Sequence, residues 1–188
     1  PEFRMYRPIF EVALARRAPL LAAHPSSEHL RASMQGLSAE DARALQLEQP
    51  LPESQIAAQR EEIRESHCGH ANDAMLTAMQ RAQAYKDAFM ARALRTAQTA
   101  TVLIAGRGHA RNDRAVPYFL HRHRAEHVLS VAFMDVSDDR VSAADYDVAA
   151  FDFVVFTPRV SDEDPCEAFR KQLEQMRKPA QATCTQGC

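Results

Sequence analysis

The most constraining feature of this 188-residue chain is a short, continuously apolar run that stops at a glycine. Residues 101–105 (Thr-Val-Leu-Ile-Ala) are rich in β-branched side chains, and Gly106 ends the run. A run without polar alternation suits a strand that is covered on both faces, so it predicts a strand of a parallel sheet. A chain built around such a strand is expected to fold as an α/β protein.

Three further apolar runs predict the neighbours of this strand. They cover residues 20–23, 128–133 and 151–156. Stretches with helical periodicity separate the runs, and this alternation is typical of parallel sheets. The expected fold class is therefore α/β, with a parallel-type sheet of about four strands flanked by helices.

The helices are predicted from apolar residues that recur every three or four positions. They are expected at residues 8–17, 71–97, 116–124 and 164–176. The segment from Gln35 to Glu65 also favours helix, but Pro50 and Pro52 interrupt it. Because proline breaks a helix, this segment predicts a small helical excursion from the sheet.

Charge and hydropathy exclude some classes of protein. The chain has 23 basic and 25 acidic residues and a formal net charge of −2, so it lacks the excess of positive charge that coats nucleic acid or binds anionic membranes. No apolar run approaches the roughly 20 residues that cross a bilayer.

One domain is expected over residues 4–178, with residues 1–3 as a cloning scar or part of a longer chain, and residues 179–188 as a disordered tail.

The turn after the main apolar run carries the strongest candidate site. Its sequence is Gly106-Arg107-Gly108-His109-Ala110-Arg111. Ligands of open parallel sheets bind at the carboxyl ends of the strands, so His109 would project into a cleft between two arginines that suit a carboxylate or phosphate. The alternative is a simple turn with a surface histidine. Arg111 stands where a dinucleotide fingerprint needs its third glycine, so no nucleotide site is expected.

Two other groups of residues are candidates for ligand binding or cross-linking. His67, Cys68 and His70 either offer soft metal ligands within four residues or form a polar loop before the long helix. Cys68 and Cys166 lie in the body of the chain, where they either pair as a disulfide or stay free thiols.

Tyr85 lies in the long predicted helix, next to Lys86. A tyrosine among small residues is either a packed core side chain or a phenolate ligand of ferric haem iron. In the second case, Lys86 would meet a haem propionate.

Several short motifs occur in an order seen in one known family. They are Tyr6-Arg7-Pro8, His67-Cys68, the segment Gln83-Ala84-Tyr85-Lys86-Asp87-Ala88-Phe89-Met90-Ala91, residues 104–113, Val116-Pro117, Phe156-Thr157-Pro158 and Asp164-Pro165-Cys166. From about Tyr6 to Phe169, the chain is thereby similar to the C-terminal part of the ChaN-like haem-binding (lipo)protein family, in the broader group related to TIKI/EreA-type folds. The strand ending in Gly-Glu-x-His that opens such proteins does not occur in this sequence.

The resemblance implies a non-catalytic haem-binding protein of bacterial haem or iron uptake, periplasmic or attached to the outer membrane through an N-terminal lipid anchor in the parent protein. It implies a haem pocket at a homodimer contact, with a tyrosine bound to iron and basic residues at the propionates. Tyr85 is the expected iron ligand, and Tyr118 and Tyr6 are the alternatives. The other expected haem-binding residues are Lys86 and His109 at the propionates, supported by Arg107 and Arg111.

Two other functions stay open at this point. In distant relatives, the related Gly-x-x-His motif serves as a metal or catalytic site. A metal-dependent hydrolase would use His109 with His67 and His70 as ligands. The remaining alternative is an incomplete piece of a longer protein without activity of its own.

Overall fold

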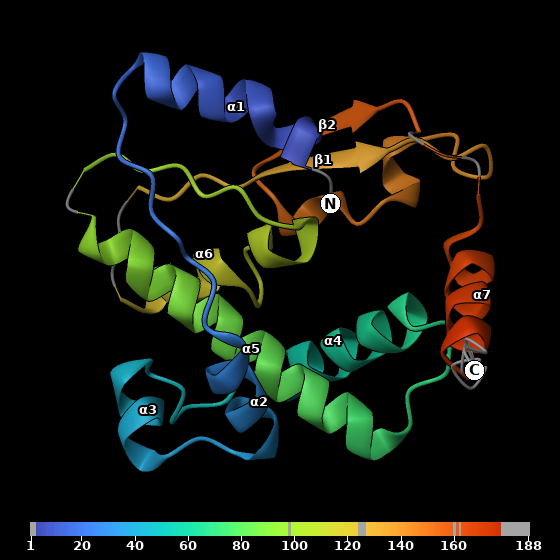
Figure 1. The fold of residues 1–188 in the computed structure, drawn as a ribbon, viewed down its shortest axis with the longest axis horizontal. Helices are drawn as coiled ribbons and strands as arrows, with labels where there is room; N and C mark the ends of the chain where they lie inside the picture. Colours follow the sequence, from blue (N-terminus) through green and yellow to red (C-terminus); the bar gives the residue numbers. More distant parts are fainter. Residues whose placement is uncertain (1–2, 98, 124–126, 160, 162, 178–188) are drawn as a thin grey trace, which may run out of the picture.

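A computed structural model shows a mostly helical chain with one small sheet (Figure 1). The structure describes residues 3–97, 99–123, 127–159, 161 and 163–177. The helices are α1 (Phe3–Ala15), α2 (Ser27–Gln35), α3 (Ala39–Ala44), α4 (Glu53–Ser66), α5 (Asp73–Thr96), α6 (Val116–Arg122) and α7 (Pro165–Arg177). The strands are β1 (Val131–Asp135) and β2 (Phe153–Thr157), and the short 3₁₀ turns are η1 (Arg107–Ala110), η2 (Ala143–Asp145) and η3 (Val148–Ala150).

Helix α5 is the longest helix and packs against α2, α4 and α6. It begins after Asn72, whose side chain accepts a hydrogen bond from the Met75 N–H at 2.9 Å. Asp73 in the first turn and Arg95 in the last complement the helix dipole. The apolar stripe of α5 forms the main core with α6 and one residue that follows α3. The buried members of this core are Leu45, Tyr85, Ala88, Met90, Ala91, Val116, Phe119 and Leu120.

The two strands are parallel, with Val131 opposite Phe153. One face of the sheet covers a second, smaller core. Its buried members are Ala132, Met134, Tyr146, Ala150 and Phe151. The opposite face is open, since Phe133 is 66 % exposed and Phe153 is 59 % exposed.

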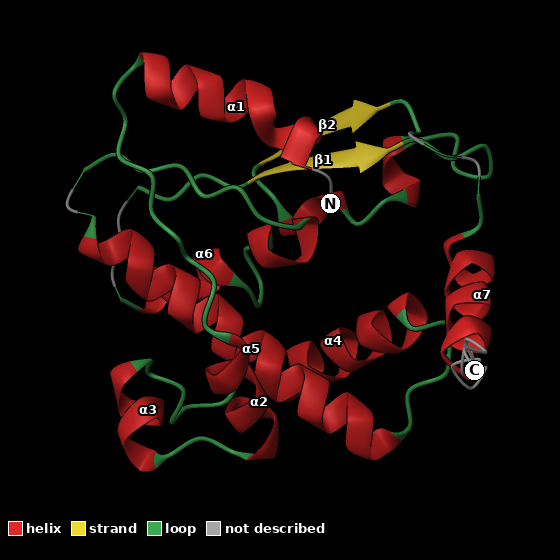
Figure 2. Cartoon of the chain, in the orientation of Figure 1, coloured by secondary structure: helices red, strands yellow, loops and turns green. Residues whose placement is uncertain are grey.

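Within the described residues, the sheet has two strands instead of the about four that the sequence predicts (Figure 2). The runs at 128–133 and 151–156 correspond to β1 and β2, each shifted by two or three residues at its start. The runs at 20–23 and 101–105 belong to no strand, and Val102 is 85 % exposed. A strand needs a hydrogen-bonded neighbour, and neither run has one within the described residues. The α/β class holds, and the strand count was wrong.

The predicted helices are confirmed, with shifted ends. Helix α1 begins at Phe3, five residues before the predicted start, and α6 ends two residues early. The two prolines separate α3 from α4, and Pro52 lies at the N-cap of α4. The predictions for residues 1–2 and 179–188 lie outside the described residues.

One disulfide joins Cys68, in the turn between α4 and α5, to Cys166 at the start of α7, with 5.5 Å between the Cα atoms. Pairing is thus the correct alternative of the two that the sequence allows. The ring of Phe169 in α7 contacts the rings of His67 and His70, at 6.3 and 6.0 Å between centroids. These histidines therefore pack against α7, which Figure 1 shows at one side of the molecule.

The structure bears on two features considered from the sequence, a metal site and a membrane-spanning helix. Within the described ranges, no three His, Cys, Asp or Glu side chains are grouped so as to hold a metal ion. The ligand set of His109, His67 and His70 is therefore not assembled. Among the described helices, none has both the length and the apolar character needed to span a bilayer.

Alanine substitutions at Phe119 and Val102 separate the core from the unpaired run. Phe119 is 1 % exposed, so Phe119→Ala should lower the free energy of unfolding by about 3–5 kcal/mol. Val102→Ala should change it by less than about 0.5 kcal/mol, because the side chain is already in water. Urea denaturation measures both. A cost above about 1 kcal/mol at Val102 would show that residues 101–105 form a covered strand after all.

Candidate functional site

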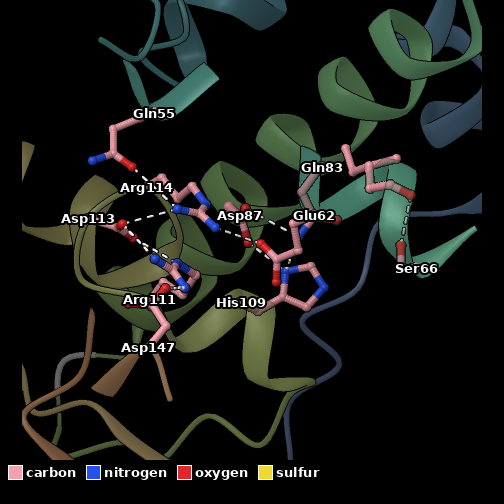
Figure 3. A network of polar contacts seen from close by, with 11 residues as sticks. Gln55, Glu62, Ser66, Gln83, Asp87, His109, Arg111, Asp113, Arg114 and Asp147 are labelled. Atoms are coloured by element: carbon pink, nitrogen blue, oxygen red, sulfur yellow. Dashed lines mark hydrogen bonds and ion pairs between the residues drawn. The ribbon is translucent and has the colours of Figure 1, made fainter. Parts of the chain in front are cut away.

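The turn η1 directly follows residues 101–105 and places His109 against α5. Gly106, before the turn, is extended (φ −60°, ψ 147°), and its carbonyl accepts a hydrogen bond from the His109 N–H at 2.9 Å. This hydrogen bond closes a tight turn. Figure 3 shows that the side chain of His109 points from this turn to Asp87 of the long helix.

The side chain of His109 is held by a buried carboxylate. Its Nδ1 lies 2.5 Å from Oδ1 of Asp87, whose side chain is 0 % exposed. Gln83, one turn earlier in α5, places its Nε2 3.0 Å from the same ring nitrogen and 3.5 Å from Asp87 Oδ2. An ionised carboxylate only accepts hydrogen bonds, so Nδ1–H of His109 donates to it, and the Gln83 amide then donates to Oδ2 of Asp87 instead of to the ring nitrogen. We call Asp87 and His109 the dyad.

Burial sets the acidity of Asp87. Desolvation raises the pKa of Asp87 to about 6, and the hydrogen bond and charge of His109, together with the charge of Lys86, oppose this effect only in part. Water stabilises an ionised carboxylate more than the protein interior does. The buried position of Asp87 therefore disfavours the negative charge that its ionised carboxylate brings to the dyad.

Replacing Asp87 by asparagine tests this balance. Because the folded-state pKa of Asp87 is raised, the folded protein binds this proton more tightly than the unfolded chain. The stability that Asp87 contributes is therefore greatest below about pH 4 and falls by on the order of 3 kcal/mol as the pH rises to about 6. We expect the free energy of unfolding of the wild type, minus that of Asp87→Asn, to fall across this range in urea denaturation. A difference that rises with pH would contradict the raised pKa.

Two buried arginines form a second polar network near the dyad (Figure 3). Arg111 binds Asp113 through two hydrogen bonds of 2.9 and 2.8 Å and Asp147 through one of 2.5 Å. Arg114 contacts Asp113 at 3.1 Å and Glu62 at 2.7 Å. Burial alone would lower the pKa of Arg111, but its carboxylate partners outweigh this effect and raise it. Arg111, predicted to support a propionate, is therefore already neutralised by two carboxylates.

A polar cavity of about 530 Å³ lies beside these arginines. It is lined by one side of α4, by the η1 turn with the loop that follows it, and by residues from Met134 of β1 to Phe151, just after η3. The lining residues are Ser54, Gln55, Ala58, Glu61, Glu62, Glu65, Arg107, Gly108, Arg111, Asp113, Arg114, Met134, Arg140, Tyr146, Asp147 and Phe151.

A second hollow, which we call the apolar groove, has a volume of about 550 Å³. It is formed by one face of α1, by the two apolar runs that belong to no strand, and by the end of α5. The lining residues are Phe3, Tyr6, Ile9, Phe10, Ala13, Pro19, Leu20, Leu21, Ala23, Ala93, Leu94, Thr101, Val102, Leu103, Ile104, Ala105 and Gly106. Gly106 lines this groove and the next residue, Arg107, lines the polar cavity, so the two hollows adjoin at the η1 turn.

The three candidate tyrosines lie in different surroundings. Tyr85 is 4 % exposed within the main core, its ring centroid is 6.2 Å from that of Phe89, and burial raises its pKa. Tyr118 is half-buried against Phe119. Neither of these two lines the groove or the cavity, whereas the half-buried Tyr6 of α1 lines the apolar groove.

The structure does not bring Tyr85 and His109 together. Residues two apart in a helix point about 200° away from each other around its axis, and Asp87 is the residue that faces His109. Tyr85 therefore points away from the dyad, into the core. Lys86 lies between them and is half-buried, and Arg107 is exposed on the η1 turn.

Asp87 is the site residue that sequence reasoning missed. It belongs to the motif that carries the family resemblance, but the motif alone does not indicate a role for it. The available signal was its position, three residues before Met90 and four before Ala91, which are both buried. An aspartate on the buried face of a helix needs a specific partner, and here that partner is His109.

A sequence model of the family described as "Haem-binding uptake, Tiki superfamily, ChaN" matches residues 1–120 of the chain. The chain belongs to this family. The match includes the η1 turn, the dyad and all residues that line the apolar groove, and it confirms the resemblance found from the motifs. The ChaN family's description supports a role in haem-binding uptake. No curated protein and no solved structure matches the chain.

Proposed function

We propose that this protein binds haem in the apolar groove, as a non-catalytic component of bacterial haem or iron uptake. The observation that carries the proposal is the groove itself. Its volume of about 550 Å³ lies within the range of about 300–1,000 Å³ that is typical of cofactor sites, and apolar side chains form nearly all of its lining. Haem is a flat apolar ring with two carboxylates at one edge, so it needs such a slot with polar groups nearby.

The groove offers the phenol of Tyr6 as a ligand for the iron. Tyrosine is one of the axial ligands that proteins use for haem iron, and bound haem would supply the iron centre. Tyr6 lines the groove from α1, together with Phe10 and Ala13. Tyr85 would have to leave the core to reach it, so the structure favours Tyr6 among the alternatives that the resemblance allows.

Cationic groups lie at the Gly106 end of the groove. Arg107 follows Gly106 directly and is exposed. The Cδ2 atom of His109 lies 3.9 Å from the point where a Cβ atom on Gly106 would stand. Guanidinium and imidazolium groups bind carboxylates well, so we assign the propionates to Arg107 and His109, with Lys86 as a further cation.

Location and assembly form part of the same proposal. Disulfides persist in oxidising compartments, so the Cys68–Cys166 bond supports a periplasmic location. Attachment to the outer membrane through a lipid anchor in the parent protein is the part of the proposal that comes from the family resemblance. Helix α1 leaves Met5, Val12 and Leu14 each more than 60 % exposed. A second copy of the chain would cover this apolar surface in a homodimer.

Tyrosine variants test the iron ligand. Tyr6→Phe removes the phenol oxygen but keeps the ring that lines the groove, so it should weaken hemin binding at least about tenfold and abolish the ferric–phenolate spectrum. Tyr85→Phe and Tyr118→Phe are matched controls that should leave both unchanged. Absorbance titration with hemin measures all four proteins.

Each result of this titration decides a separate point. A wild-type protein that does not bind hemin would overturn the proposed function. A loss in Tyr85→Phe, with Tyr6→Phe unchanged, would move the ligand to the core tyrosine.

A further inference from the structure

The buried carboxylate of Asp87 has no part in the haem site as described so far, although it makes the closest contact to His109. We propose that Asp87 is a positioning residue: it holds Nδ1 of His109 so that the opposite ring nitrogen, Nε2, receives a ligand carboxylate at the Gly106 end of the apolar groove. This inference rests on the proposed function, because the carboxylate is that of a porphyrin propionate.

The geometry fixes which nitrogen is available. Nδ1 of His109 lies 2.5 Å from Asp87, on the side of α5. Nε2 is bonded to Cδ2, and Cδ2 is the atom that lies next to Gly106, at 3.9 Å from its missing Cβ position. Gly106 in turn lines the groove. The side chain of His109 is 17 % exposed, so it is not fully enclosed by the protein.

The chemistry of imidazole then couples ligand binding to a proton. With Nδ1–H donated to Asp87, a neutral imidazole has only a lone pair on Nε2, and this lone pair repels a carboxylate. The imidazolium form donates from both nitrogens, to Asp87 and to the ligand. A carboxylate that binds next to the neutral imidazole must therefore be accompanied by uptake of one proton, so its affinity should fall as the pH rises.

Other charged groups near the dyad come from three elements. Asp87 and Lys86 belong to α5, and Arg107 precedes His109 by two residues in η1. Glu62 of α4 lies 3.8 Å from the position of a Cβ on Gly108 and is paired with Arg114. Of these groups, Asp87 is hydrogen-bonded to His109 and is fully buried. Asp87 is thus the group that stabilises the imidazolium form most directly.

The test compares two probes, metal-free protoporphyrin IX and its dimethyl ester, by fluorescence titration at pH 6.5 and pH 8.5. Neither probe contains iron, so the iron ligand does not contribute. Wild-type protein should bind protoporphyrin IX about tenfold more weakly at the higher pH, and it should bind the ester equally at both. Asp87→Asn and His109→Gln should lose the pH dependence. Asp147→Asn is the matched control, since this carboxylate pairs with Arg111, and it should keep the dependence.

The outcomes separate this inference from the proposed function. If the wild type binds neither hemin nor protoporphyrin IX, both are overturned. If it binds with no pH dependence, or if Asp87→Asn keeps the dependence, the role of Asp87 is overturned and haem binding stands.

A measurement on the ligand-free protein covers the case in which Asp87→Asn fails to fold. Long-range ¹H–¹⁵N NMR spectra of the wild type at pH 8.5 should show His109 protonated at Nδ1 and bare at Nε2. The opposite tautomer would overturn the inference without any porphyrin present.

Discussion

The hydrogen bond between Asp87 and His109 is the contact on which the site depends. It joins residues 22 apart in the sequence, one in the longest helix and one in the turn that ends the strongest apolar run. A fully buried carboxylate is costly unless it is paired, so the position of η1 against α5 is tied to this bond. The same turn lies where the apolar groove and the polar cavity adjoin. The dyad thereby holds in place the turn that borders both hollows.

The sequence predicted the elements whose signals are local. The periodicity of α5 and the break at Pro52 depend on neighbouring residues, and the structure confirms them. The strands at 20–23 and 101–105 failed because a strand also needs a partner, which the composition of the run cannot supply. The family match with the haem-binding uptake proteins shows that short motifs in the right order carried more information than the strand pattern.

The site was predicted in part, and the errors have a physical cause. His109 was expected to project into a cleft between two arginines, and its side chain instead lies against Asp87 of the long helix. Tyr85 was expected to bind iron in the same pocket as His109, but the rotation of the helix places Tyr85 in the core and presents Asp87 to His109 instead. Arg111 was expected to be free for an anion, and nothing local in the sequence indicates its bond to Asp147, 36 residues away. The groove could not be foreseen either, because it exists only where the two apolar runs stay unpaired beside α1.

The location of bound porphyrin tests the central claim most directly. Ferric hemin broadens the NMR signals of nearby amides, and zinc protoporphyrin serves as the diamagnetic reference. With ¹⁵N-labelled protein, we predict broadening in α1 and at residues 20–23 and 101–106, and unchanged signals at Ser54 and Ala58 of the polar cavity. Broadening centred on the polar cavity, or on the core around Tyr85, would contradict the assignment of haem to the apolar groove.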